Sequence, residues 1–104
     1  MTTVDLGLLS DYEHGAARTV EAPGRKLVVV RIDEQLYVLD DRCSHEDFPL
    51  SLGEVNADTC EIECERHGAQ FRLSDGEPTS FPATRPVATY EVTRRDDRYE
   101  VVVP

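Results

Sequence analysis

Four side chains that commonly bind metal ions occur as two pairs of the same composition. Cys43 and His45 stand in the stretch DRCSHED, and Cys64 and His67 follow in IECERHGAQF. The first pair has the spacing C-x-H, and the second has the spacing C-x-x-H-G. A thiolate and an imidazole from each of two segments can hold either a zinc ion or a two-iron cluster.

The division of these residues between the two segments favours the iron–sulfur centre. A zinc site usually takes a closely spaced pair of cysteines from one segment and its second pair from another element. Here each segment contributes one cysteine and one histidine. Cys43 and Cys64 would bind one iron, and His45 and His67 the other. A zinc-stabilised interaction module without a redox role remains the alternative.

Length and charge limit the possible functions. The chain has 104 residues, with 11 basic and 21 acidic side chains and a formal net charge of -10. We expect a single domain, residues 1–104, which is too short for a nucleotide-binding fold beside a catalytic one. A carrier is therefore expected and not an enzyme, with no catalytic residue. The negative charge disfavours nucleic acid and anionic lipid and favours a basic partner.

The N-terminal stretch and the cysteine count indicate a compartment. MTTVDLGLLSDYEHG has no cationic region followed by an apolar run, and no segment approaches the roughly 18 apolar residues of a membrane span. Three cysteines, an odd number, suit metal ligation in a reducing compartment better than a secreted disulfide scaffold. The expectation is a cytoplasmic protein that does not bind membranes.

Short segments rich in β-branched and aromatic residues alternate with turn residues along the chain, which predicts an antiparallel all-β domain with little helix. Alternation at the C-terminus predicts a shared core face. The expected strands are 4–9, 17–22, 26–33, 36–40, 59–64, 69–73, 88–95 and 98–103, and the expected core residues at the C-terminus are Tyr90, Val92, Tyr99, Val101 and Val103.

Three irregular segments interrupt the predicted strands. Residues 41–58 carry the first pair of metal-binding residues, and residues 64–68 carry the second. Residues 76–86 contain three prolines, which exclude them from a central strand and suggest a rigid lid. Of the remaining cysteine and histidine, Cys60 is expected to be a buried core thiol, and His14 an exposed turn residue.

The motif CSH followed by CERHG resembles the Rieske [2Fe–2S] signature. The stretches EDFPLSLGEV, GAQFRLSDGEP and FPATRPVATYEV resemble stand-alone Rieske-type ferredoxins that serve as ferredoxin subunits of non-haem-iron oxygenases, some of them associated with the SUF system of iron–sulfur assembly. The resemblance covers most of the chain from about Val28. It implies a Rieske-type fold, in which an antiparallel β-sandwich-like base carries a small cluster-binding β subdomain, here at about residues 41–86.

The resemblance also implies a function. The chain would be a monomeric one-electron carrier with one [2Fe–2S] cluster, whose ligands would be Cys43, His45, Cys64 and His67. Its partners would be a flavin-dependent ferredoxin reductase as electron donor and the oxygenase component as acceptor. Iron–sulfur assembly proteins are the alternative acceptor.

Several positions point to a low reduction potential within the Rieske range, which spans roughly -150 to +300 mV. High-potential relatives carry two cysteines of a cross-loop disulfide where this chain has Phe48 and Arg66. They carry Ser and Tyr hydroxyls near the cluster where this chain has Ala69 and Phe71. Both kinds of feature favour the reduced state, so their replacement predicts a potential near the lower limit.

Overall fold

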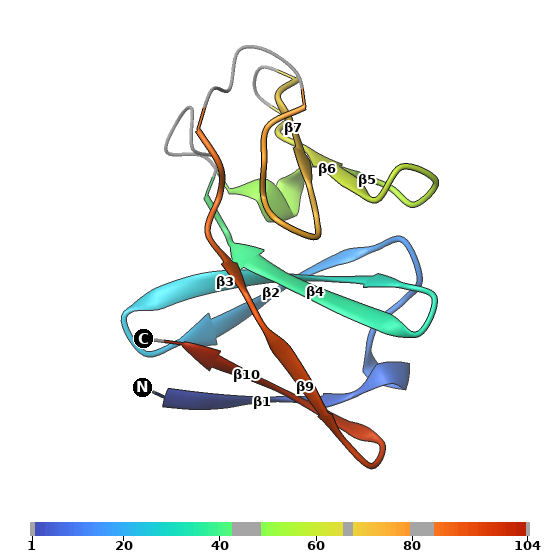
Figure 1. The fold of residues 1–104 in the computed structure, drawn as a ribbon, viewed down its shortest axis with the longest axis vertical. Coiled ribbons are helices and arrows are strands. Elements are labelled where there is room, and N and C mark those ends of the chain that lie inside the picture. The colour runs from blue at the N-terminus through green and yellow to red at the C-terminus, as the bar shows by residue number, and fades with distance from the viewer. Residues whose placement is uncertain (1, 43–48, 66–67, 80–84, 104) are drawn as a thin grey trace.

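A computed structural model describes residues 2–42, 49–65, 68–79 and 85–103 of the chain, which measures 39 × 30 × 19 Å along its principal axes (Figure 1). The described chain is almost entirely antiparallel β-structure, as predicted, with two single-turn 3₁₀ helices. Neither helix is long or apolar enough to cross a membrane. The elements are β1 (Thr2–Leu8), η1 (Leu9–Asp11), β2 (Ala17–Ala22), β3 (Arg25–Ile32), β4 (Gln35–Asp40), η2 (Leu50–Leu52), β5 (Glu54–Asn56), β6 (Glu61–Glu63), β7 (Gln70–Arg72), β8 (Thr89–Tyr90), β9 (Val92–Arg95) and β10 (Arg98–Val103).

The strands form three sheets that lie one above another in Figure 1. The lowest sheet has the order β1-β10-β9, the middle sheet β2-β3-β4-β8, and the uppermost β5-β6-β7. Every neighbouring pair of strands is antiparallel. The chain passes from the middle sheet into the uppermost sheet after β4 and returns at β8, so the uppermost sheet is inserted between two strands that pair with each other.

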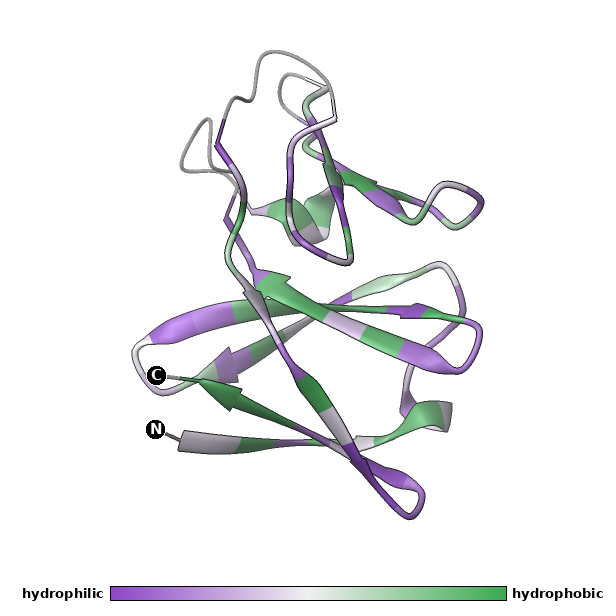
Figure 2. Cartoon of the chain, in the orientation of Figure 1, coloured by the Kyte–Doolittle hydropathy of each residue, from purple (hydrophilic) through white to green (hydrophobic). Residues whose placement is uncertain are grey.

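The middle sheet is buried on both faces because β3 is apolar on both of its sides. Leu27, Val28, Val29 and Val30 are all fully buried. Since successive side chains of a strand point to opposite faces, these four residues contribute alternately to two cores. Figure 2 shows the apolar colouring concentrated along the interior of the strands and the polar colouring at the hairpin ends.

Two cores separate the three sheets. The lower core consists of Leu6, Tyr12, Leu27, Val29, Leu36, Val38, Tyr99, Val101 and Val103. The upper core consists of Val28, Val30, Ile32, Leu39, Leu50, Ile62, Cys64, Ala69, Phe71, Leu73 and Val87. The upper core therefore joins the middle sheet to the inserted sheet.

Two of the hairpin turns contain only two residues each. Ile32 pairs with Gln35, so the β3–β4 turn contains only Asp33 and Glu34. The β9–β10 turn likewise contains only two residues, Asp96 and Asp97. Asp33 and Asp96 have φ values of 53° and 54°, the left-handed conformation that two-residue hairpins require at their first turn position.

The structure corrects three sequence-based expectations. Residues 41–58 are not wholly irregular, because they contain η2 and β5. Residues 88–95 form two strands in different sheets, divided at Glu91. The predicted strand at residues 59–64 shortens to Glu61–Glu63, because Cys60 adopts a φ of 55° in the preceding turn.

The expected core face at the C-terminus is confirmed for β10. Tyr99, Val101 and Val103 are buried in the lower core. Tyr90 and Val92 are only partly buried and pack against the same core from its margin. The Tyr99 hydroxyl also donates to the Glu34 carbonyl at 3.1 Å, which ties β10 to the β3–β4 turn.

Candidate metal centre

Cys64 is the one predicted ligand that lies within the described residues. It follows β6 directly, is 1% exposed and belongs to the upper core. Its backbone N–H donates to the Ala69 carbonyl at 2.7 Å, and its carbonyl accepts from the Gly68 N–H at 2.9 Å. The left-handed φ of 72° at Gly68 allows the chain to turn back into β7. The thiol of Cys64 is therefore placed by a short loop with a closed base.

The other three predicted ligands, Cys43, His45 and His67, lie outside the described residues, as do Phe48 and Arg66. The structure describes the ends of the segments that carry them. Figure 1 shows that these ends lie in the upper part of the molecule, beyond the middle sheet.

The ends of the first ligand-bearing segment are joined by side-chain hydrogen bonds. The backbone N–H of Ser51 donates to Asp41 Oδ1 at 2.7 Å, and the Ser51 hydroxyl donates to Oδ2 at 2.8 Å. Leu50, just before Ser51, is fully buried in the upper core. The segment therefore leaves from the end of β4 and returns to a fixed point on the core.

The first segment also packs against the strand that leads to Cys64. A Cβ atom placed on Gly53 would lie 1.7 Å from the carbonyl oxygen of Glu63, the residue before Cys64. The Gly53 N–H donates to the Leu50 carbonyl at 2.9 Å, which closes η2. Backbone packing thus fixes the return of the first segment relative to the start of the second.

The proline-containing segment 76–86 is closed at its base and tied to the inserted sheet near its N-terminal end. The Val87 N–H donates to the Gly76 carbonyl at 2.8 Å, and the Thr79 N–H donates to the Gln70 carbonyl at 2.8 Å. Pro78 forms an isolated antiparallel bridge with Phe71. Residues 80–84 lie outside the described chain, so the suggestion that this segment acts as a lid remains a prediction.

The outer face of the inserted sheet is strongly acidic. Glu54 and Glu63 are direct partners on β5 and β6, and Glu61 lies on the same face. The pKa of Glu61 is lowered mainly by a hydrogen bond from the Thr79 hydroxyl. A hydrogen bond from the Thr59 hydroxyl lowers it further. The three glutamates make this face acidic.

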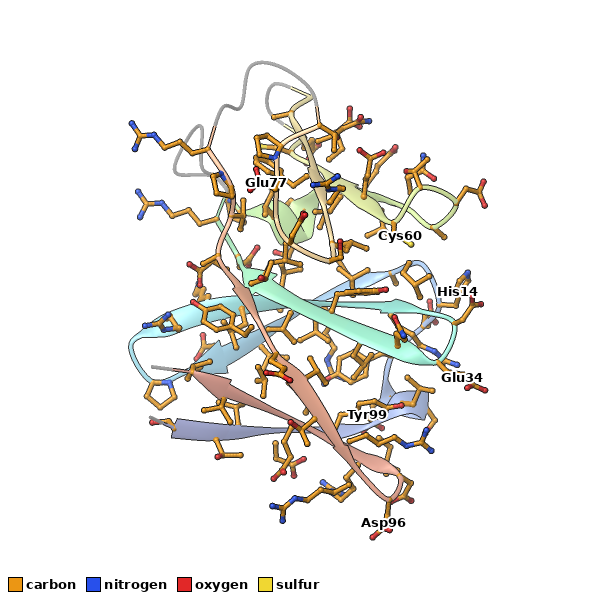
Figure 3. The ribbon with its side chains drawn as sticks, in the orientation of Figure 1. His14, Glu34, Cys60, Glu77, Asp96 and Tyr99 are labelled. Atoms are coloured by element: carbon orange, nitrogen blue, oxygen red, sulfur yellow. The ribbon has the colours of Figure 1, made fainter. Side chains whose placement is uncertain are left out.

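The remaining histidine and cysteine lie together below the inserted sheet. His14 and Cys60 line one open groove at the edge of the molecule (Figure 3). His14 is exposed, as predicted, and its Nδ1 accepts from the Asp33 N–H at 2.9 Å. Cys60 packs against the upper core, as expected, but is only partly buried. Among residues with described placement, no three His, Cys, Asp or Glu side chains form a metal site.

Comparison with known proteins identifies similar chains. The model of the family described as "Rieske [2Fe-2S] domain" matches residues 2–91. Ferredoxin CarAc of Metapseudomonas resinovorans is 38% identical over 84 residues, which is 80% of this chain and 77% of the relative.

Two solved structures are similar over almost the whole chain. The ferredoxin of carbazole 1,9a-dioxygenase from Nocardioides aromaticivorans IC177 has a TM-score of 0.92 and 30% identity, covering 97% of each chain. A chain in a complex of reduced oxygenase and oxidized ferredoxin of carbazole 1,9a-dioxygenase has a TM-score of 0.88 and 32% identity, covering 95% of this chain and 91% of that one. These similarities confirm the expected fold.

Proposed function

This chain belongs to the Rieske [2Fe–2S] domain family, and we propose that it carries single electrons from a flavin-dependent reductase to the terminal component of a non-haem-iron oxygenase. The observation that carries the proposal is a fold that matches an oxygenase-system ferredoxin with a TM-score of 0.92 and includes a buried thiol at Cys64. Relatives of this kind are electron carriers and not catalytic enzymes.

The family implies a Rieske-type [2Fe–2S] cluster as the cofactor. We assign Cys43, His45, Cys64 and His67 as its ligands, and residues 41–86 as the subdomain that holds it within a single domain of residues 1–104. The described donor fits this cofactor, since Cys64 offers a thiol that is shielded from water at a loop with a closed base. Such a cluster supplies a site that gains and loses one electron at roughly -150 to +300 mV.

The described part of the chain excludes water from Cys64 and fixes the bases of the segments that carry the proposed ligands. Cys64, Ala69 and Phe71 are all fully buried in the upper core, so the protein side of the centre is apolar. Backbone hydrogen bonds hold the second ligand loop, and the contact between Gly53 and Glu63 fixes it relative to the first. A site held in this way changes little in geometry when its charge changes, which suits an electron carrier.

The oxygenase component as acceptor is supported by a similar ferredoxin that was solved in complex with its oxygenase. We further propose that the chain is a cytoplasmic monomer and that it docks transiently. Reduction by a reductase and onward transfer to a purified oxygenase component can be followed together by stopped-flow absorbance. If the reduced chain rapidly reduced iron–sulfur assembly proteins and not an oxygenase, its function would be electron donation to cluster assembly.

Metal and sulfide analysis of the purified chain tests the cofactor directly. We expect two irons and two labile sulfides per chain, with the visible absorbance and the electron paramagnetic resonance (EPR) spectrum of a Rieske centre. A colourless protein that contains zinc and no labile sulfide would instead establish the zinc-stabilised interaction module.

A further inference from the structure

Asp41, the first residue after β4, makes two hydrogen bonds to Ser51. The Ser51 N–H donates to Oδ1 at 2.7 Å, and the Ser51 hydroxyl donates to Oδ2 at 2.8 Å. The Thr19 hydroxyl also donates to Oδ2, at 3.4 Å, and the N–H of Asp41 donates to the Lys26 carbonyl at 3.0 Å. Asp41 therefore connects Ser51 to the hairpin formed by β2 and β3.

These bonds close the segment between Asp41 and Ser51. Asp41 and Ser51 are ten positions apart in the sequence, and Cys43 and His45 lie between them. The second ligand loop is much shorter, and backbone hydrogen bonds at Cys64 close it. The entropic cost of closing a loop rises with its length. A side chain that joins the ends therefore stabilises the longer segment more than it would stabilise the shorter one.

The groups that donate hydrogen bonds to Asp41 indicate that this residue has a positioning role. Within the described residues, the donors to Asp41 are the Ser51 N–H and the hydroxyls of Ser51 and Thr19, which are all neutral groups. An ionised acceptor strengthens each of these hydrogen bonds relative to a neutral one. Asp41 and Ser51 are also partly buried, which limits competition from water.

We infer that Asp41 is a positioning residue that, through Ser51, fixes the two ends of the segment carrying Cys43 and His45 and so holds the first ligand pair at the cluster. This inference rests on the proposed cluster and its four ligands. It assigns to Asp41 a function that does not require contact with the metal.

Three variants separate geometry from charge. Asp41→Ala removes both bonds to Ser51, and Ser51→Ala removes only the bond from the hydroxyl. Asp41→Asn keeps a carbonyl oxygen for the Ser51 N–H and offers an amide N–H to the Ser51 hydroxyl, so it preserves the link without the charge. If geometry is what matters most, Asp41→Asn should behave more like the wild type than Asp41→Ala does.

The matched control is Asp5→Ala, on the opposite side of the molecule. Asp5 also accepts one backbone N–H, from Gly7 at 2.9 Å, and one side-chain donor, from Arg98 at 2.7 Å. It lies on β1 in the lowest sheet. The control therefore loses a similar pair of bonds without touching either ligand segment.

The experiment measures loss of cluster absorbance in excess chelator and the EPR spectrum of the reduced protein. We expect Asp41→Ala to release iron about tenfold faster than the wild type, because two bonds to a charged group are lost, and to broaden the EPR spectrum. Ser51→Ala should show a smaller effect. Asp41→Asn should fall between the wild type and Asp41→Ala, because it keeps the link with weaker hydrogen bonds. Asp5→Ala should retain the wild-type release rate and spectrum.

The outcomes distinguish the two proposals. A wild-type chain without iron and sulfide overturns the proposed function, and this inference with it. A wild-type cluster with unchanged release and spectrum in Asp41→Ala overturns the positioning role alone, and so does an equal effect in Asp5→Ala. Should Asp41→Ala fail to fold, Ser51→Ala decides the question by the same two measurements.

Discussion

Gly53 lies directly against the carbonyl oxygen of Glu63, so the return of the first ligand segment and the strand that precedes Cys64 meet through their backbones. The position has no room for a side chain, since a Cβ atom would come within 1.7 Å of that oxygen. The relative position of the two ligand segments therefore depends on the absence of a single methyl group.

Gly53→Ala is predicted to lower the free energy of unfolding by about 2 kcal/mol or more, because overpacking at a backbone contact forces the two segments apart. Urea unfolding of the wild type and the variant measures the difference. Gly24→Ala is the control, since its φ of 76° imposes strain, but nothing lies within 4 Å of the new methyl group. An equal or larger loss in Gly24→Ala would contradict the importance of the contact.

Cys64→Ser is predicted to abolish or badly destabilise cluster binding, because it replaces the thiol of a proposed ligand, and to reduce the order of the surrounding loops. Cys60→Ala should bind iron and sulfide like the wild type. Both residues are cysteines associated with the upper core, four positions apart in the sequence, so the pair forms a matched test. Normal iron and sulfide content in Cys64→Ser would remove this residue from the proposed ligand set.

Thr79→Val is predicted to raise the pKa of Glu61, because the Thr79 hydroxyl is the main group that lowers it. A carboxyl whose pKa is lowered by folding stabilises the fold at pH values above its unfolded-state pKa, which is about 4.3. That stabilisation is lost as pH falls through the folded-state pKa. Side-chain carboxyl NMR titration measures the change, with Thr93→Val, an exposed position on β9, as control. An unchanged Glu61 titration would contradict the assignment.

The reduction potential is predicted to lie near the lower limit of the Rieske range, about -150 mV. Ala69→Ser and Phe71→Tyr should each raise it by a few tens of millivolts, because a hydroxyl that donates to the cluster favours the reduced form. The limit is about 65 mV per bond, if each bond contributes about 1.5 kcal/mol. Direct electrochemistry on the three proteins measures the shifts.

The burial of both positions means that these two substitutions can also destabilise the fold. Ala69 and Phe71 are both fully buried, so each new hydroxyl must find a partner or destabilise the fold by about 1–3 kcal/mol. A wild-type potential well above zero, or a stability loss without any rise in potential, would show that these side chains do not face the cluster.

Reduction by the cognate reductase is predicted to slow as ionic strength rises. The net charge of -10 would steer the chain to a basic partner, and the screening length falls from about 30 Å at 0.01 M to about 8 Å at 0.15 M. Stopped-flow absorbance measures the rate. Dithionite, an anionic reductant, should show the opposite dependence, and a reductase rate that is independent of salt would count against electrostatic steering.

The strand pattern could be predicted wherever alternation or a run of β-branched residues was long. β2 and β10 match the expected segments, because each offers six residues with a clear preference. β5 was missed because three residues, Glu54–Asn56, carry no recognisable period. The division at Glu91 was missed because the change from one sheet to another depends on tertiary packing and leaves no local signal.

The site could be predicted only as a set of residue types. The spacing of cysteines and histidines identified the ligand candidates, because the chemistry of a cluster restricts which residues can hold it. The link between Asp41 and Ser51 could not be predicted, since Asp and Ser are ordinary loop residues whose pairing depends on the folded chain. The packing of Gly53 on Glu63 joins two segments that pair only in the folded sheet.

The burial of β3 on both faces also determines how its alignment with its neighbours is fixed. In a sheet with one wet face, a shift by one residue exposes apolar side chains to water. In β3 the same shift would exchange Val28 and Val29 between two apolar cores, so hydrophobicity distinguishes poorly between the two alignments. Arg31 supplies the distinction, since its guanidinium donates to the carbonyls of Tyr12 and Leu9 at 2.9 and 3.3 Å. A shifted strand would carry that charge into the upper core, where those acceptors are out of reach.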